Sequence, residues 1–533
     1  MSASNRELRP RSAGSGFRID WVDGLLAAGV LVGTVAYLSA LPHNLSPADE
    51  SVYLYQAKRI LAGEVLYRDV FEITTPGWMY LMALLFRLFG TSIETARMAM
   101  AVIHALTAVL IYFTCRRIGI RRALSWPPAL AYVVVCQPAW PIASQHWLGT
   151  CLSVALLLTC SGPARVRASW AVLPGIVVGL LVDVHQQRGL MLGVGVFSWL
   201  IVDRALLRRS RQRPSASVVA ELACFVAGAA LAVVPLVAGA VVTAGFDNVW
   251  RALVIHPLFN YRATTHCAWG QLSPILAEQG SYTFPRLLKF LPLILLMSLA
   301  RLAVSTARRR ATDEVRALAL LIVFCLASML SIVYYPDFIH IAFIAPIFFI
   351  AAAENLEWAA NTVPVPAATL RTSGWIAAAA FLIACGVRLQ HNRARSWAAY
   401  PFSRLTAFGR VDFAREFEVR LYEQVRDLMR TVPSRQLFCY PILSYLYLMA
   451  DADNPTRFQY FLPGYSTPEQ IQEVIEVLGE RKLPYIVAFT GFVRPDDPIV
   501  AYLRRDYEPL SEAGDVGQAI FRRKPDAGAA RAD

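Results

Sequence analysis

The chain has 533 residues, of which 56% are hydrophobic and only 17% are charged, and its mean hydropathy is +0.44. Soluble domains carry about 25% charged residues, so this composition excludes an ordinary soluble protein and favours one embedded in a lipid bilayer. The formal net charge of +13 does not indicate a nucleic-acid partner, because the arginines occur in short clusters between apolar segments, as membrane topology requires.

Apolar segments long enough to cross a membrane occur along most of the chain. A helix needs about 20 apolar residues to cross the hydrocarbon core, and fewer where other helices surround it. We therefore predict an α-helical polytopic membrane protein with about eleven transmembrane helices. The predicted spans are 21–41, 95–115, 123–137, 143–160, 169–183, 189–203, 215–243, 286–305, 315–333, 339–354 and 372–390.

The arginine clusters predict the orientation of these spans. Basic residues are abundant before the first span and in every second connection after it, whereas intervening connections such as QPAWP and YYPDF contain none. Since Lys and Arg stay on the cytoplasmic side, we expect a cytoplasmic N-terminus and, with eleven spans, an external C-terminus. The Ala- and Arg-rich composition favours a bacterial inner membrane with the periplasm outside, and an endoplasmic-reticulum membrane is the alternative.

The segment GWMYLMALLFRLFG (77–90) departs from this scheme. If it crossed the membrane, every later orientation would invert and the arginine clusters would lie outside. We therefore expect it to lie along the outer face or dip into it, with Arg87 reaching the interface. A true span is the alternative interpretation.

The first external loop, 42–94, holds an unusual density of charge. Asp49 and Glu50 open a helical pattern, where the helix dipole favours carboxylates. Tyr53 and the apolar residues after it recur at amphipathic spacing, so this helix is predicted to lie on the membrane. A further carboxylate, Glu72, stands just before a Thr-Thr-Pro turn. Acids held beside basic residues at the water–lipid boundary suit chemistry on a phosphate-bearing lipid.

The last part of the chain, 392–533, is less hydrophobic and is predicted to form a small external α/β domain, which leaves 1–391 as the transmembrane domain. SRQLFCYPI and LPYIVAFTG are typical of buried strands. TPEQIQEVIEVLGERK predicts a helix with Thr467 as its N-cap. DADNPTRFQYFLPGY is expected to be a structured loop.

Ionisable residues beside the outer ends of spans are functional candidates, because burying them in a membrane is costly. The motif DVHQQRG lies at a predicted helix break, where it either lines a donor cavity or closes a helix turn as an internal ion pair. The Asp and His of YYPDFIH begin a later span, where they either contact a phosphate or metal or cap the helix. With the His of ASQHWLG, the candidates in this group are His146, His185, Gln187, Arg188, Asp337 and His340.

The order of these features resembles that of a known family. One span is followed by an Asp-Glu pair that opens an amphipathic helix, then by GEVLYRDVFEITTPGWMYLMALLFRLFG, and then by an Arg and another span. This order is similar to that of the membrane glycosyltransferases with a GT-C fold, in the branch of protein O-mannosyltransferases and lipid A aminoarabinose transferase. The similarity is most specific over 21–115. Thr74 and Thr75 stand where Lys-Pro is common in the family.

The resemblance implies transfer of a sugar from a polyprenyl-phosphate donor to a hydroxyl acceptor, with inversion at the anomeric carbon. Asp49 is then expected to be the general base that takes the proton of the attacking hydroxyl, and Glu50 is the second catalytic candidate, as neighbour of the base or as a contact to a metal or to the acceptor. The leaving phosphate needs positive charge. A divalent metal held by Glu72 and a His would supply it, or basic side chains would, and the basic candidates are Lys58, Arg59, Arg68, Arg97 and Arg188.

The main alternative is a transporter or flippase of lipid-linked sugars, because recognition of polyprenyl phosphate needs similar basic residues. A transporter is expected to show internal repeats with broken helices in matching halves, and no such repeat is visible in the sequence. The charges concentrate on one external face, which favours an enzyme. The sugar and the acceptor, whether lipid, envelope glycan or protein, are not specified by these patterns.

Overall fold

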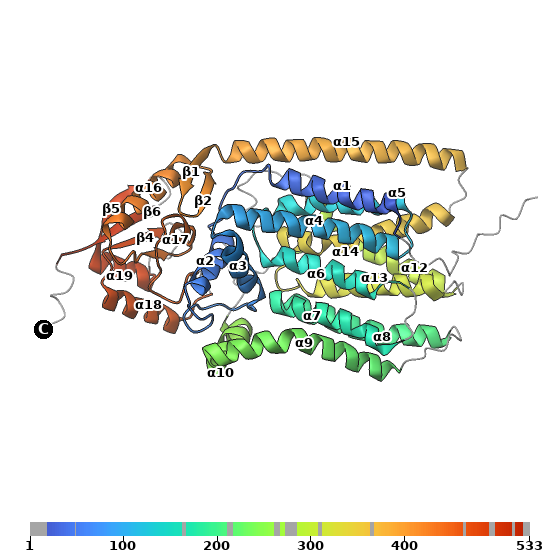
Figure 1. Ribbon diagram of the computed structural model, residues 1–533, viewed down its shortest axis with the longest axis horizontal. Coiled ribbons are helices and arrows are strands. Elements are labelled where there is room, and N and C mark those ends of the chain that lie inside the picture. Colours follow the sequence, from blue (N-terminus) through green and yellow to red (C-terminus); the bar gives the residue numbers. More distant parts are fainter. Residues whose placement is uncertain are drawn as a thin grey trace, which may run out of the picture.

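A bundle of long helices forms most of the molecule, and a smaller α/β domain sits at one end of it (Figure 1). The computed structural model describes residues 19–47, 49–162, 167–209, 217–260, 267–271, 285–307, 312–362, 367–461, 465–489, 496–513 and 518–525. Two short helices of the first external loop, α2 (Asp49–Leu61) and α3 (Gly77–Phe89), lie where the bundle meets the domain.

Each of the eleven predicted spans contains a helix. These helices are α1 (Trp21–Leu38), α4 (Ile93–Arg117), α5 (Arg122–Ala131), α6 (Gln145–Cys160), α7 (Val172–Val184), α8 (Gln186–Arg209), α9 (Val218–Ala244), α12 (Leu291–Ala307), α13 (Thr312–Leu330), α14 (Phe338–Thr362) and α15 (Ala367–Ala399). Shorter helical segments adjoin them: η1 (Tyr132–Cys136), η2 (Gln137–Ala139), η3 (Ala168–Ala171), α10 (Phe246–Trp250), η4 (Arg251–Asn260) and η5 (Pro285–Phe290).

The number of membrane crossings is a separate question from the number of helices. Six helices of the described chain are long and apolar enough to cross a bilayer by length and composition. Three shorter apolar helices accompany them, over Gly77–Phe89, Gln145–Cys160 and Ala168–Val184. The exact count of eleven spans therefore remains a prediction, since a buried helix such as α6 can cross with fewer apolar residues than a lipid-facing one.

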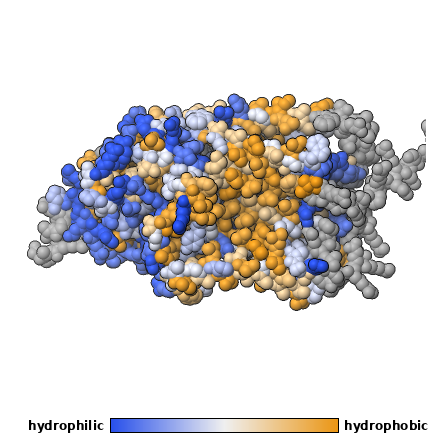
Figure 2. Space-filling view, in the orientation of Figure 1, coloured by the Kyte–Doolittle hydropathy of each residue, from blue (hydrophilic) through white to orange (hydrophobic). Residues whose placement is uncertain are grey.

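The outer surface of the bundle is apolar. Figure 2 shows a broad hydrophobic band over the helices, next to a hydrophilic C-terminal domain. On α9, Leu231, Val234 and Val242 are 65%, 58% and 84% exposed. A continuous apolar surface of this kind is unfavourable in water. The bundle is therefore the part that lies in the membrane.

The bundle end farther from the C-terminal domain gathers the described arginines of the basic connections. Asp23 of α1 accepts hydrogen bonds from Arg116 at 3.2 Å, from Arg122 at 3.0 Å and from the Tyr112 hydroxyl at 2.6 Å. The start of α1, the end of α4 and the start of α5 thus meet at one end. The alternation of basic connections along the chain, and the side of the membrane that this end faces, stay predictions.

Helix α3 corresponds to the segment 77–90. Its 13 residues rise only about 20 Å, less than the hydrocarbon core of about 30 Å. Leu84, Leu88 and Phe89 are 52%, 62% and 71% exposed, while the opposite face is buried. The structure therefore supports the interfacial interpretation. A Cβ on Gly77 would lie 2.6 Å from the Asp183 carbonyl oxygen, so only glycine lets α3 start this close to the end of α7.

The C-terminal domain begins after α15, which runs beyond the predicted boundary at residue 391 to Ala399. A hairpin of β1 (Phe402–Thr406) and β2 (Gly409–Phe413) comes first. A four-stranded sheet then has the order β3-β4-β6-β5, with β3 and β4 parallel and the other pairs antiparallel. Its strands are β3 (Phe438–Tyr440), β4 (Tyr485–Phe489), β5 (Tyr507–Ala513) and β6 (Gln518–Arg523), and its helices are α16 (Glu416–Thr431), α17 (Tyr445–Met449), α18 (Pro468–Arg481) and α19 (Pro498–Asp506).

The predicted elements of this domain are confirmed. The two predicted strands are β3 and β4, and the predicted helix is α18. Thr467 caps α18 through a reciprocal pair of bonds with Gln470, and Val474 and Leu478 on its apolar face are fully buried. A short polar capping pair followed by apolar residues at helical spacing is among the most local signals in a sequence.

Candidate active site

Helix α2 places two neighbouring carboxylates in different surroundings. Glu50 is fully buried and forms an ion pair with Arg97, and it also accepts a hydrogen bond from the Ser46 backbone N–H at 3.0 Å. Arg97 further donates to the Asn44 carbonyl oxygen. Because its oxygens are already bonded, Glu50 ties the start of α2 to α4. A direct part of Glu50 in the chemistry stays a prediction.

Asp49 has no such partner. Among the described side chains none forms an ion pair with it, and its side chain is partly buried. Desolvation raises the pKa of the Asp49 carboxyl above its ordinary value of 3.8, while nearby His340 lowers it and Asp337 raises it. A carboxylate with a raised pKa and no fixed cation is suited to accept a proton.

Tyr53 lies one turn after Asp49 and is influenced by both carboxyls of the first loop. Gln145 donates from its amide to the Tyr53 hydroxyl oxygen at 3.2 Å, which links α2 to the start of α6. Desolvation raises the pKa of Tyr53 well above 10.0, and Glu72 and Asp49 add to the shift. The Tyr53 hydroxyl therefore stays protonated at neutral pH.

Glu72 organises the Thr-Thr-Pro turn. One of its oxygens accepts from Gln56 at 2.8 Å, and the other accepts from the backbone N–H groups of Ile73 and Thr74 and from the Thr74 hydroxyl, each at 2.9 Å. Burial nevertheless raises the pKa of the Glu72 carboxyl. No group of three His, Cys, Asp or Glu side chains in the described chain is placed to hold a metal. The pairing of Glu72 with a His as metal ligands stays a prediction, and in this structure both Glu72 oxygens already accept hydrogen bonds.

Three histidines meet at the outer ends of α6, α7 and α14. His146 Nδ1 lies 3.1 Å from His185 Nε2. The rings of His146 and His340 are 5.4 Å apart in an edge-to-face arrangement, and Phe343 stacks flat on His146 at 4.6 Å. Asp337 binds both His340 Nδ1, at 2.7 Å, and the His340 backbone N–H, at 2.8 Å. The predicted cap on α14 is thus present, and it also orients an imidazole toward the cluster.

Arg188 supplies the cluster with positive charge. Its side chain is only 2% exposed, and its Nη1 donates to the His146 carbonyl oxygen at 3.0 Å and to the Thr150 hydroxyl at 3.2 Å. Its Nε and Nη2 are buried and have no hydrogen-bond partner within the described part of the chain, and no described acid pairs with it. A buried guanidinium is costly unless a counter-charge satisfies it. The Nε and Nη2 groups of Arg188 are therefore available to bind an anion.

The other basic candidates are engaged elsewhere. Lys58 forms an ion pair with Asp451 at 2.7 Å, and exposed Arg68 pairs with Asp69 at 2.8 Å. Arg59 binds Glu64 and also donates to the Thr456 carbonyl oxygen at 2.9 Å. Lys58 and Arg59 stand nine or ten residues after Asp49, about 14 Å along the helix. They fasten the first loop to the C-terminal domain, and the structure does not bring them to the histidines. Arg97, as described, is neutralised by Glu50.

Some contacts were missed by the sequence interpretation. Gln186, rather than Gln187, holds the turn of the first loop: its Oε1 accepts from the Thr75 N–H at 2.9 Å and its Nε2 donates to the Ile73 carbonyl oxygen at 3.0 Å. Gln187 is half-buried. Phe343, which stacks on His146, carried no signal beyond the apolar pattern of its span. The register of a helix after a break decides which of two adjacent glutamines faces inward, and the sequence does not define it.

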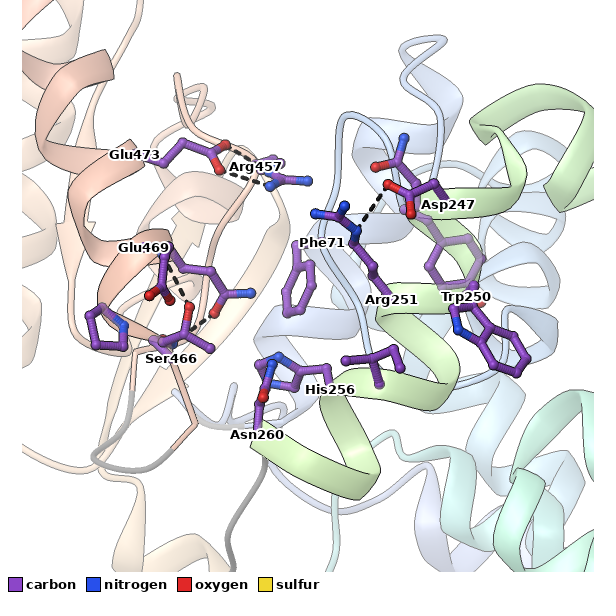
Figure 3. Close-up of a pocket in the computed structure, with 16 residues that line it drawn as sticks. Phe71, Asp247, Trp250, Arg251, His256, Asn260, Arg457, Ser466, Glu469 and Glu473 are labelled. Carbon is purple, nitrogen blue, oxygen red and sulfur yellow. Dashed lines mark hydrogen bonds and ion pairs between the residues drawn. The ribbon is translucent and has the colours of Figure 1, made fainter.

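A second feature of the structure is a cleft at the C-terminal domain. A cleft of about 850 Å³ opens between α18 and the segment α10–η4. Figure 3 shows Phe71 in its middle, His256 below, and the charged residues Arg457, Glu473, Asp247 and Arg251 on its two walls. The Phe71 ring meets the His256 ring edge to face at 5.1 Å, and His256 meets Tyr465 at 5.5 Å. The ring contacts thus run from the cleft to Tyr465, and Tyr465 and Tyr460 are near enough to Tyr53 to raise its pKa.

Together, the apolar bundle, the short helices α2 and α3 and the C-terminal α/β domain define an integral membrane protein with a GT-C-like fold. No family model matches the chain, and no curated protein matches it in sequence. Among solved structures, it is similar to ArnT from Cupriavidus metallidurans in the apo state, with 15% identity and a TM-score of 0.57 over 95% of this chain and 99% of that one. It is also similar to the same protein bound to undecaprenyl phosphate, with 13% identity and a TM-score of 0.55 over 95% and 98%. The expected fold is confirmed.

Proposed function

We propose that the protein is a membrane glycosyltransferase that moves a sugar from a polyprenyl-phosphate donor to a hydroxyl acceptor at the outer membrane face. The observation that carries this proposal is Arg188, a buried guanidinium without a counter-charge beside three histidines, one of which, His340, is near enough to Asp49 to lower the pKa of its carboxyl. The similarity of fold to a protein whose structure holds undecaprenyl phosphate supports a donor of this class.

In this proposal Arg188 receives the phosphate of the donor. Its free Nε and Nη2 would donate to phosphate oxygens, and charge-assisted bonds of this kind are stronger than neutral ones. In the hydrogen bonds described, His146 and His340 use only their Nδ1 atoms, which leaves Nε2 of each ring for the donor, whereas both ring nitrogens of His185 are engaged, by His146 and by the Arg188 backbone N–H. The wider set of Lys58, Arg59, Arg68 and Arg97 is reduced to Arg188, because each of the other four already has an acid partner.

Asp49 acts as the general base. The acceptor hydroxyl oxygen attacks the anomeric carbon from the side opposite the phosphate, and the Asp49 carboxylate takes the hydroxyl proton as the new C–O bond forms. The bond between the anomeric carbon and the phosphate oxygen breaks, and its electron pair leaves with the polyprenyl phosphate. A single displacement inverts the anomeric configuration, and positive charge stabilises the leaving phosphate.

A transporter of lipid-linked sugars is the alternative. Transporter sites lie near the membrane midplane between two repeats. The candidate residues instead gather where α2 meets the first turns of α6 and α14 and the α7–α8 break, beside the external domain. A cluster at one end of the bundle fits chemistry on one side of a membrane, which favours the enzyme. We place this side in the periplasm of a bacterium, with the N-terminus in the cytoplasm.

The test has two arms. Mass spectrometry of lipid-linked sugars and envelope glycans in cells lacking the gene should show one sugar missing from a glycan or lipid and its lipid-linked form accumulating, which names the donor. Purified protein should bind undecaprenyl phosphate, Arg188→Gln should abolish this binding, and Arg251→Gln, which changes an exposed arginine, should not. Unchanged lipid-linked sugars in the deletion strain would reject the proposal.

A further inference from the structure

The outer cleft has an electrostatic character different from that of the Arg188 site. Of the residues that line it, two are cations and three are anions. Arg457 forms two bonds of 2.7 Å with Glu473, and Arg251 pairs with Asp247 at 2.9 Å, while Glu469 adds one more negative charge. Both arginines are therefore neutralised by their partners. A ligand rich in phosphate would meet a surface of its own sign, which disfavours its binding.

The floor of the cleft offers a polar atom that lacks a partner. His256 is 2% exposed, and its Nε2 is buried without a hydrogen bond in the part of the chain that the structure describes. Burial lowers the pKa of His256, so its imidazole is neutral at neutral pH, and this nitrogen has the capacity for one hydrogen bond with a neutral group. Phe71 beside it presents an aromatic ring within the cleft (Figure 3).

Sugars match this combination of groups. A pyranose ring has an apolar C–H face that packs on an aromatic ring and a rim of hydroxyls that donate and accept hydrogen bonds. The cleft walls supply amide and hydroxyl groups for that rim, from Asn248, Ser466, Thr467 and Gln470. Its volume of about 850 Å³ is in the range of ordinary ligand sites, about 300–1,000 Å³.

We infer that the outer cleft binds the acceptor and that this acceptor is an uncharged sugar chain rather than a phosphate-bearing lipid. The inference rests on the proposed function and assigns a substrate class to it. The chain lies against Phe71 and His256, and its terminal hydroxyl passes the layer formed by His256 and Tyr465 to reach Tyr53 and Asp49. Phosphate recognition is thus kept at Arg188 and glycan recognition in the cleft.

Site-specific photocrosslinking in cells of the native host tests this inference. A benzoylphenylalanine replaces Asn260, which lines the cleft, or its neighbour Phe259, which is 66% exposed and does not line it. Mass spectrometry of the crosslinked protein should find an adduct of sugar residues without phosphate at position 260 and none at position 259. A phosphate-bearing or peptide adduct at 260, equal adducts at both positions, or no adduct would overturn the inference.

Two further substitutions, each made in the chain that carries benzoylphenylalanine at position 260, distinguish an uncharged glycan from a phosphate-bearing ligand. Glu469→Lys should leave the adduct yield at position 260 within about twofold, because an uncharged ligand gains little from a new cation. A severalfold rise would indicate an anionic acceptor and contradict the inference. His256→Ala should lower the yield by roughly fivefold, the equivalent of one hydrogen bond of about 1 kcal/mol.

Undecaprenyl phosphate binding to the same purified proteins separates this inference from the proposed function. His256→Ala and Glu469→Lys should bind undecaprenyl phosphate like the wild type. Loss of that binding in either variant would show that the cleft belongs to the donor site. If the wild type itself bound none, the proposed function would fail, whatever the crosslinks showed.

Discussion

The guanidinium of Arg188 donates from Nη1 to the backbone carbonyl oxygen of His146 at 3.0 Å. This bond links the first turn of α8 to the first turn of α6 across the outer end of the bundle. It holds a positive charge against three imidazoles while leaving the other two guanidinium nitrogens without partners. An arrangement of this kind is costly to fold and is expected where a protein trades stability for binding.

Replacement of Arg188 by methionine should separate the effect of this side chain on stability from its effect on donor binding. Arg188→Met removes an unpaired buried charge and keeps the aliphatic stem, so thermal stability should stay equal or rise, whereas binding of undecaprenyl phosphate should fall at least tenfold, the equivalent of about 1.4 kcal/mol. The matched control is Arg301→Met, which leaves fully buried Glu354 without its cation and should destabilise by about 3–5 kcal/mol. Equal destabilisation by both variants would mean that Arg188 has a structural partner.

Asp49→Asn should abolish sugar transfer and leave the protein folded. Loss of a general base costs about 10²–10⁴-fold in rate, and Asp49 has no described ion pair whose loss would unfold α2. Glu50→Gln is the matched control, since it breaks the buried contact with Arg97 and should lower the unfolding temperature. Transfer at the wild-type rate by Asp49→Asn would reject Asp49 as the base.

The pH dependence of transfer follows from the surroundings of Asp49. Its pKa is raised above 3.8 by desolvation, and the base works only when deprotonated, so the rate should fall as the pH drops through this raised value. Protonated His340 lowers the pKa of Asp49, whereas Asp337 raises it. His340→Gln should therefore move the acidic limb of the rate profile to higher pH. A shift to lower pH, or none, would show that another group controls this limb.

The basic residues at the end of α2 should affect domain docking rather than donor binding. Arg59 is 6% exposed and bonds the carbonyl oxygens of Asp69 and Thr456 as well as Glu64. Arg59→Ala should destabilise the protein by about 2–4 kcal/mol and speed hydrogen exchange in 451–461, with undecaprenyl phosphate affinity unchanged. Exposed Arg68 serves as control, and Arg68→Ala should change neither the stability nor the hydrogen exchange of 451–461. A loss of lipid affinity confined to Arg59→Ala would restore its assignment to the phosphate.

Local sequence signals defined the helices and the cap of α18, because the bonds involved lie within a few residues. The site was harder to predict, since its contacts join distant segments. Asp49 and Glu50 are adjacent acids, but successive helical residues point about 100° apart, and only Glu50 meets Arg97. The sequence predicted Lys58 as a phosphate ligand, but in the structure its ammonium group pairs with Asp451, which is 393 residues away in the chain. Contacts between distant segments decide which charged side chains remain available for a ligand. No local pattern in a single sequence shows these contacts.

The loop 451–461 completes the first external loop although it lies near the other end of the chain. The Tyr55 hydroxyl accepts from the Asn454 N–H at 2.8 Å, and the Phe71 N–H donates to the Arg457 carbonyl oxygen at 2.8 Å. During synthesis, a nascent chain that has inserted every helix of the bundle still lacks these bonds. The final domain must be synthesised before α2 is fastened, so a chain that ended before residue 451 would leave the first loop without these bonds.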